Sequence, residues 1–110
     1  MVPQSVPSTA AASLDTDERA LVDVREDDEW AAGHAPQAQH LPLQQVPERL
    51  GALPEGPLAI TCRSGGRSAQ ATAYLRQQGY DAVNVDGGMH AWVAAGRELV
   101  SEDGQDPRVA

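Results

Sequence analysis

The residues best suited to chemistry lie in one short stretch that joins a nucleophile to positive charge. In order, the stretch consists of Cys62, Arg63, Ser64, Gly65, Gly66, Arg67 and Ser68. Two adjacent glycines let the backbone turn tightly and aim successive N–H groups at one point, which makes an anion-binding loop. The segment that follows is predicted to begin a helix, whose N-terminus favours negative charge. We therefore predict that Cys62 has a lowered pKa and acts as a nucleophilic thiolate.

A free cysteine can also serve only as a small hydrophobic core residue, and this is the commoner role. Cys62 is the only cysteine of the chain and comes shortly after the apolar run 58–60. That places it at the C-terminal end of a predicted strand, where open α/β sheets bind their ligands. We favour a functional sulfur and keep a structural cysteine beside an ordinary turn as the alternative.

The rest of the chain is acidic, so positive charge is confined to a few places. Of 110 residues, 16 are Asp or Glu and 8 are basic, which gives a formal net charge of −8. All the basic residues are arginine, and Arg63 and Arg67 both lie in the Cys62 stretch. The negative charge argues against sequence-independent nucleic-acid binding and against attraction to anionic membranes. A small anion is the predicted ligand.

The cysteine count and the histidine positions argue against a resident metal or cofactor. One cysteine excludes an internal disulfide and any multi-cysteine zinc or iron–sulfur site. His34, His40 and His90 fall on three different predicted elements, so we expect turn and helix-start roles for them. The ring of His34, in a Gly-His-x-Pro turn, is predicted to hydrogen-bond the backbone.

The chain also lacks the sequence features of a membrane or secreted protein. No apolar stretch approaches the roughly 20 residues that a membrane span needs. The first residues carry no basic region followed by a long apolar run, as a signal peptide would. We predict a soluble cytoplasmic protein.

Predicted strands and helices alternate along the chain, and this arrangement must position the Cys62 stretch. We expect short strands at 4–6, 20–24, 40–43, 57–61 and 82–85, and helices at 8–14, from the acidic run 26–29 to Gly33, and at 46–53, 68–78 and 89–95. Such alternation over short connections indicates an α/β fold with a mostly parallel sheet and helices on both faces. Residues 1–100 form one predicted domain, and 101–110 a polar tail that we predict to be flexible.

Three charged residues near the second predicted strand could form an acid–base set. Arg25 and Glu29, however, are spaced for a structural ion pair at a helix start. We therefore favour an architectural role for Asp23, Arg25 and Glu29. Trp92, in the last predicted helix, is expected to be a core anchor.

Four stretches in order give the chain a family resemblance. They are residues 21–26, Glu-Trp at 29–30 with Gly-His-Ala-Pro at 33–36, the Cys62 stretch, and Asp-Gly-Gly at 86–88 followed by Trp92. Together they resemble a single-domain rhodanese, a thiosulfate or persulfide sulfurtransferase, over roughly residues 4–97. Gln37 and Glu98 depart from the family pattern, which usually has glycine and proline there. The resemblance implies a five-stranded parallel sheet flanked by helices.

The length of the loop separates two chemistries that this fold supports. Four residues lie between Cys62 and Arg67, which resembles the sulfurtransferase loop. Related phosphatases and arsenate reductases have one residue more, because a tetrahedral group needs a wider ring of N–H donors. A phosphatase or arsenate reductase is therefore only a distant alternative.

The resemblance implies covalent catalysis in two steps. The Cys62 thiolate attacks the sulfane sulfur of a donor such as thiosulfate and keeps it as a persulfide until a thiol or cyanide removes it. Arg63 would draw in the anionic donor, and Arg67 would either face the anion or fold back to bond carbonyls and brace the loop. Ser64 and Ser68 would bond the anion, or in the case of Ser68 cap the helix.

The expected partners are a small sulfur-containing anion and a thiol acceptor, with a sulfur-relay protein as one candidate. Two readings without thiosulfate turnover stay open. In one, the protein is a persulfide carrier that is loaded by another protein. In the other, it is a redox-sensing module that uses the same thiol.

Overall fold

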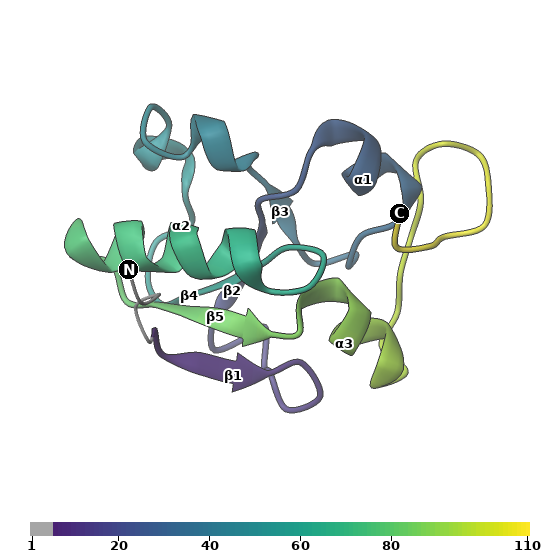
Figure 1. The fold of residues 1–110 in the computed structure, drawn as a ribbon, viewed down its shortest axis with the longest axis horizontal. Helices are drawn as coiled ribbons and strands as arrows, with labels where there is room; N and C mark the ends of the chain where they lie inside the picture. Colours follow the sequence, from purple (N-terminus) through teal and green to yellow (C-terminus); the bar gives the residue numbers. More distant parts are fainter. Residues whose placement is uncertain (1–5) are drawn as a thin grey trace.

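The structure is a computed structural model that describes residues 6–110. Its centre is a five-stranded sheet with strand order β1-β5-β4-β2-β3, and every pairing is parallel (Figure 1). The strands are β1 (Ser8–Ala10), β2 (Ala20–Asp23), β3 (Gln39–His40), β4 (Leu58–Thr61) and β5 (Ala82–Asp86). The helices are α1 (Asp27–Ala32), α2 (Gly66–Gln77) and α3 (Gly88–Ala94), with short 3-10 turns η1 (Leu43–Gln45) and η2 (Leu50–Ala52). The predicted α/β class and parallel sheet are confirmed.

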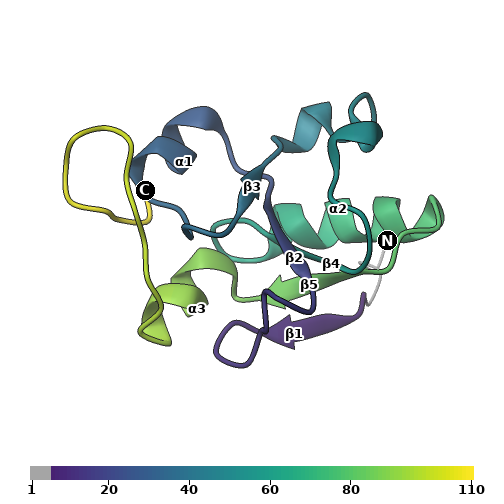
Figure 2. The same cartoon turned by 180° about the vertical axis from the view of Figure 1, so that it is seen from behind.

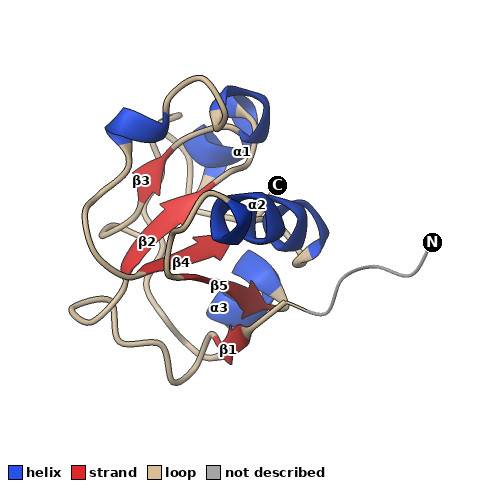
Figure 3. Ribbon diagram, turned by 90° about the vertical axis from the view of Figure 1, so that its left-hand side faces the viewer, coloured by secondary structure: helices blue, strands red, loops and turns tan. Residues whose placement is uncertain are grey.

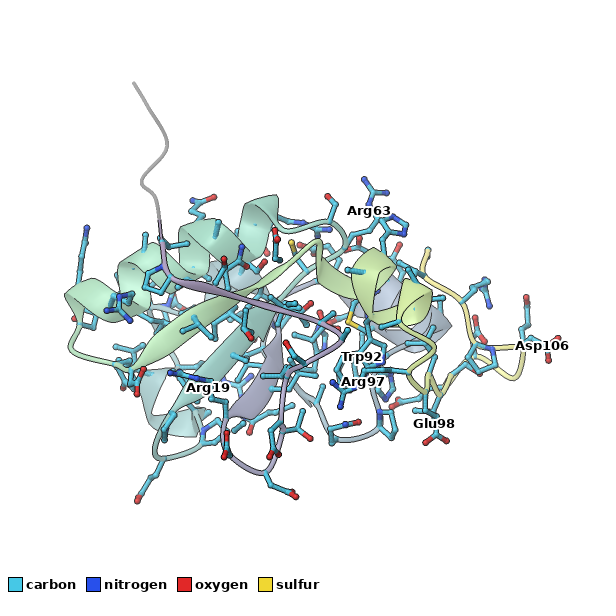
Figure 4. All side chains as sticks on the ribbon, turned by 90° about the horizontal axis from the view of Figure 1, so that it is seen from below. Arg19, Arg63, Trp92, Arg97, Glu98 and Asp106 are labelled. Carbon is cyan, nitrogen blue, oxygen red and sulfur yellow. The ribbon has the colours of Figure 1, made fainter. Side chains whose placement is uncertain are left out.

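The sheet separates two hydrophobic clusters because side chains alternate along each strand. On the central strand β4, Leu58 and Ile60 pack in the cluster that contains α2, whereas Ala59 packs in the cluster that contains α3. Figure 3 shows α2 lying along one side of the strands. Trp92 of α3 is 1 % exposed and donates from Nε1 to the Glu98 carbonyl at 2.9 Å, as expected of a core anchor. The guanidinium of Arg97 lies over its ring (Figure 4).

The elements around the predicted site form close to where the sequence places them. β2, β4 and β5 match the predicted strands, and α1 and α3 match the predicted helices. Helix α2 begins at Gly66 rather than at Ser68, so its first turn includes part of the Cys62 stretch. Gly79, which follows α2, adopts a positive φ of 93°, as the predicted helix stop requires.

The helix predicted at 46–53 is wrong. The 3-10 turn η1 ends before this range, a turn occupies 46–48, and η2 covers only Leu50–Ala52. Val46 and Leu53 are nevertheless buried. Gly51 is unfavourable in a helix interior, and Pro54 disfavours helical geometry at the residue before it. Burial of the apolar residues is thus achieved without a continuous helix.

The first strand of the sheet lies in the segment predicted as a helix. Gln4 and Ser5 of the strand predicted at 4–6 lie outside the described residues, Val6 is not in a strand, and β1 runs from Ser8 to Ala10 beside β5. The helix predicted at 8–14 is therefore wrong, because this segment pairs with the edge of β5. At the opposite edge, the strand predicted at 40–43 shortens to Gln39–His40, since Pro42 has no N–H for a sheet.

Residues 101–110 return to α1 (Figure 2). The N–H of Glu102 donates to the Ala31 carbonyl at 2.8 Å, and that of Arg108 to the Ala32 carbonyl at 3.0 Å. The backbone of Arg108 passes so close to Gly33 that a Cβ there would collide with it. This segment thereby satisfies carbonyls at the end of α1. Its flexibility stays a prediction. No helix among the described residues is long and apolar enough to cross a membrane.

Candidate active site

Cys62 lies directly after the central strand β4, at the carboxyl end of the parallel sheet. Two backbone hydrogen bonds hold its loop from the side of α3. The Cys62 carbonyl accepts from the N–H of Met89 at 2.8 Å, and the Arg63 carbonyl accepts from the N–H of His90 at 3.0 Å. Gly88 makes this approach possible, because its φ is 58° and a Cβ would collide with both carbonyls. The Asp-Gly-Gly turn thus clamps the loop from behind.

Three donors converge on the Cys62 sulfur. Sγ accepts from the N–H of Gly65 at 3.1 Å, from the N–H of Ser68 at 3.3 Å and from the hydroxyl of Ser68 at 3.2 Å. Cys62 is only 1 % exposed. Burial raises its pKa, but hydrogen bonds from the Ser68 hydroxyl and from the N–H groups of Ser68, Gly65 and Ser64 lower it more. The net pKa lies below the ordinary value of a thiol, and the site favours a thiolate.

No side chain of the described residues caps the N-terminus of α2. Gly65 is the N-cap residue, with a φ of 115°, and it makes no side-chain capping bond. The described first turn of α2 carries no acidic residue. The N–H groups that a helix start leaves unpaired are therefore directed at the Cys62 sulfur.

Arg67 turns to α1 and not to the sulfur. Its two terminal nitrogens bind the two carboxylate oxygens of Glu29 at 2.7 and 2.8 Å. The ion pair lowers the pKa of Glu29 to about 2, chiefly through the hydrogen bond from Arg67, and raises the pKa of Arg67. The sequence left two roles open for Arg67, and this arrangement resembles bracing, although its partner is a carboxylate and not a carbonyl.

The ion pair predicted between Arg25 and Glu29 is wrong. Arg25 is fully buried and binds Asp23 through Nη2 at 2.7 Å and through Nε at 3.0 Å. Its Nη2 also donates to the Gly33 carbonyl at 2.7 Å. The spacing of Arg25 and Glu29 suggested a local pair. Instead, Arg25 pairs with the fully buried Asp23, and Glu29 pairs with Arg67 from a distant part of the sequence. These contacts fix the turn between β2 and α1.

The remaining residues of the loop face solvent. Arg63, Ser64 and Gly66 are exposed. Figure 4 shows the Arg63 side chain extending away from the body of the molecule. The positive charge of Arg63 is thus directed into solvent beside the Cys62 loop.

Asn84 is a site residue that the sequence analysis missed. It lies in the middle of β5, with Oδ1 2.5 Å from Ser68 Oγ and Nδ2 3.3 Å from the Gly65 carbonyl oxygen. The available signal was a polar residue within the apolar run 82–85. Strand alternation turns this residue toward α2 and the loop.

The histidines serve the scaffold in the described part of the chain. His34 Nδ1 lies 2.9 Å from the Trp30 carbonyl oxygen, which confirms the predicted bond between ring and backbone. The rings of His34 and His40 both stack on Trp30, at centroid distances of 3.5 and 4.7 Å. His90 is exposed on α3. Residues 6–110 hold no group of three His, Cys, Asp or Glu placed to bind a metal ion.

Comparisons with known proteins agree with this geometry. The family model of the rhodanese-like domain matches residues 6–95. A sulfurtransferase of Allochromatium vinosum is 45 % identical over 92 residues, which cover 82 % of this chain and 86 % of the relative. A putative sulfurtransferase of Bacillus subtilis, YtwF, is 45 % identical over 89 residues, which cover 77 % of this chain and 86 % of that protein.

A solved structure shares the architecture. The crystal structure of a rhodanese-related protein from Thermoplasma volcanium superimposes with a TM-score of 0.81 at 31 % sequence identity. The match covers 86 % of this chain and 97 % of that one. The sheet that carries Cys62 therefore has the same arrangement in both molecules.

Proposed function

The chain belongs to the rhodanese-like family, and on this premise we propose that it is a sulfurtransferase. Cys62 takes a sulfane sulfur from an anionic donor such as thiosulfate and passes it to a thiol or to cyanide. The observation that carries the proposal is the convergence of two N–H groups and one hydroxyl on Cys62 Sγ. These donors stabilise negative charge at the position where the reaction needs a nucleophile and a leaving group.

In the first step, a lone pair of the Cys62 thiolate attacks the outer sulfur of thiosulfate. A new S–S bond forms to Sγ, the S–S bond of the donor breaks, and sulfite leaves with the bonding electron pair. Two negative charges enter with thiosulfate and two leave with sulfite, so Cys62 persulfide keeps the single charge of the thiolate. Sulfur transfer therefore needs neither an oxidant nor a reductant.

In the second step, an acceptor thiolate or cyanide attacks the outer sulfur of the persulfide. The S–S bond to Sγ breaks, and Cys62 regains its electron pair as a thiolate. The N–H groups of the loop from Arg63 through Ser68 would hold the anionic outer sulfur during its stay. The donors that lower the pKa of Cys62 also make it a better leaving group in this step.

We assign different roles to the two arginines of the loop. Arg63, which is exposed, attracts the dianionic donor to the entrance. Arg67 acts through its ion pair with Glu29 and holds the start of α2 against α1. Ser64 and Gly66 contribute their N–H groups, and Gly65, whose φ is 115°, allows the loop to turn beside the sulfur.

The burial of the sulfur bears on the two readings without turnover. Redox-sensor cysteines combine a low pKa with solvent access. Peroxide and thiosulfate must reach the same Cys62, which is 1 % exposed, so a sensor is distinguished by its product, a sulfenic acid in place of a persulfide. A persulfide carrier would share the whole site, and only its rates would distinguish it. The cytoplasmic location inferred from the sequence stays a prediction.

Intact-mass measurement tests the proposal directly, because the chain has a single cysteine. Incubation with thiosulfate should add the mass of one sulfur atom, and cyanide should remove it. Cys62→Ser should abolish both changes while leaving the fold intact by circular dichroism. Slow loading from thiosulfate with rapid loading from a protein persulfide would identify a carrier. A wild-type protein that neither donor modifies would refute sulfur transfer.

A further inference from the structure

A buried asparagine in β5 shares the hydroxyl group that serves the sulfur. Asn84 is 8 % exposed, and its Oδ1 lies 2.5 Å from Ser68 Oγ. The same Oγ lies 3.2 Å from Cys62 Sγ. Asn84 Nδ2 lies 3.3 Å from the carbonyl oxygen of Gly65. Because a carbonyl can only accept, this second bond orients the amide with its oxygen toward Ser68.

The Ser68 hydroxyl carries one proton, for which Asn84 Oδ1 and Cys62 Sγ compete. With the proton on the side of Asn84, an oxygen lone pair of Ser68 is left to accept the S–H of a neutral thiol. With Cys62 as a thiolate, the charged sulfur is the stronger acceptor and the hydroxyl turns to it. The Gly65 carbonyl, at 3.3 Å from Oγ, is a third and more distant acceptor. Asn84 therefore favours the neutral sulfur, and the Ser68 proton favours the charged one.

We propose that Asn84 is a positioning residue that sets the reactivity of Cys62 by offering the Ser68 hydroxyl a second acceptor. Its effect on turnover rests on the proposed function. In the persulfide, Sγ is a neutral bridging sulfur, and the negative charge lies on the outer atom. The Ser68 proton then returns to Asn84, so the amide stabilises the loaded form relative to the thiolate. Discharge of the carried sulfur is slower as a result.

Other charges near the loop do not change in the variants that test this proposal. On the loop and α2 they are the two arginines, and on α1 the carboxylate that binds the second of them. An exposed aspartate ends β5, and an exposed histidine lies on α3. These groups are Arg63, Arg67, Glu29, Asp86 and His90. A shift in the Cys62 pKa on changing Asn84 to an uncharged residue must therefore arise from the hydrogen bonds.

The test is the pH dependence of alkylation by iodoacetamide, followed by intact mass, in which every adduct reports Cys62. Asn84→Ala should lower the Cys62 pKa by about half to one pH unit, and Ser68→Ala should raise it by a similar amount. The double variant should have the pKa of Ser68→Ala alone, because Asn84 acts through the hydroxyl. If Asn84→Ala weakens the fold, Asn84→Val can replace it, because valine suits a strand. It should lower the Cys62 pKa by the same amount.

Thr72→Val is the matched control. Thr72 is a buried hydroxyl residue of α2 that donates to the Ser68 carbonyl at 2.7 Å. Its removal changes the same helix turn without touching the sulfur, so the Cys62 pKa should stay at the wild-type value. A shift in this control equal to that of Asn84→Ala would attribute both to a general loosening of α2 and would contradict the proposal.

Two further outcomes would overturn it. An unchanged or raised Cys62 pKa in Asn84→Ala would mean that the amide serves only to hold the Gly65 carbonyl. An equal shift with and without the Ser68 hydroxyl would mean that it acts by another route. Alkylation does not require sulfur transfer, so a protein that fails to load sulfur can still give the predicted pKa values. If it does load, cyanide should discharge Asn84→Ala roughly two- to fivefold faster than the wild type, in line with the same hydrogen-bond energy.

Discussion

Two neighbouring turns, one from β2 into α1 and one from β4 into α2, both connect a strand to a helix start, but they differ in what binds the N–H groups of that helix start. The strands are paired in register with Asp23 opposite Thr61, so the turns begin side by side. Helix α1 has three acidic residues in its first turn, and Glu29 accepts the N–H of Glu26 at 2.9 Å. Helix α2 has no acid there and no side-chain cap within the described residues, and its donors bind the Cys62 sulfur.

The comparison shows why only one of the turns favours a thiolate. At the β2 turn, the protein's own carboxylates occupy the positive end of the helix, and the Asp23–Arg25 pair lies behind it. At the β4 turn the donors of the helix start bind the Cys62 sulfur instead. Glu29 connects the two, since it caps α1 and also binds Arg67. Four substitutions separate these contributions.

The largest expected effect comes from Gly88→Ala, which removes the clamp behind the β4 turn. The new Cβ would collide with the carbonyls of Cys62 and Arg63 at a φ of 58°. We expect a loss of about 3 kcal/mol of unfolding free energy and loss of sulfur loading. Urea unfolding and intact mass measure the two effects.

Gly56→Ala is its control, since Gly56 has a φ of 88° but no atom near a Cβ. It should cost only the backbone strain of about 1 kcal/mol and leave loading intact. Equal losses in both variants would show that the collision at Gly88 does not matter.

Glu29→Gln cuts the link between the two turns and should cost about 2 kcal/mol at neutral pH. The folded pKa of Glu29 is about 2, below its ordinary value of 4.5. The stabilisation is therefore complete above the ordinary pKa and is lost as the pH falls through about 2. Urea unfolding of both proteins should show their difference in free energy shrinking across that acidic range.

Asp103→Asn, in the exposed pair with Arg108, is the corresponding control and should change stability little. A constant difference between Glu29→Gln and the wild type from neutral to acidic pH would contradict the role given to the ion pair.

Arg63→Ala removes the outward charge of the β4 turn. The KM for thiosulfate should rise roughly fivefold at low salt, with kcat little changed, and the effect should shrink as salt screens the attraction. Arg49→Ala changes the net charge equally at an exposed position bonded to Gln45, and steady-state kinetics should find it close to wild type. Equal KM values for the Arg63 and Arg49 variants would remove the steering role.

The smallest and sharpest change gives α2 the acid that α1 has. Gly66 is exposed and has no atom near a Cβ, so Gly66→Asp should fold. The carboxylate should raise the Cys62 pKa by about half a pH unit, measured by alkylation across pH. Gly66→Asn has the same shape without the charge and should leave the pKa near its wild-type value. If the two variants shifted it alike, the charge of the first turn would not explain the difference between the turns.

The sequence pattern predicted the parts of this contrast that depend on local composition. The apolar run before Cys62, the paired glycines and the acidic start of α1 each act on residues only a few positions away in the sequence. Partners far apart in the chain were not predictable, because spacing along the sequence says nothing about them. Arg67 meets Glu29 across 38 residues, and Asn84 meets Ser68 across 16. At 46–53 the sequence suggested a helix, which Gly51 and the following Pro54 disfavour.

The almost complete burial of Cys62 has a consequence for recognition. With 1 % of the residue exposed, the empty protein offers a partner almost no sulfur to touch. Under the proposed function, loading lengthens the side chain by one S–S bond, about 2 Å. The negatively charged outer sulfur, held by the loop N–H groups, would then be the atom that an acceptor meets before Sγ. An acceptor protein could distinguish the persulfide form from the sulfur-free form by contact with a single atom, without any change in the backbone.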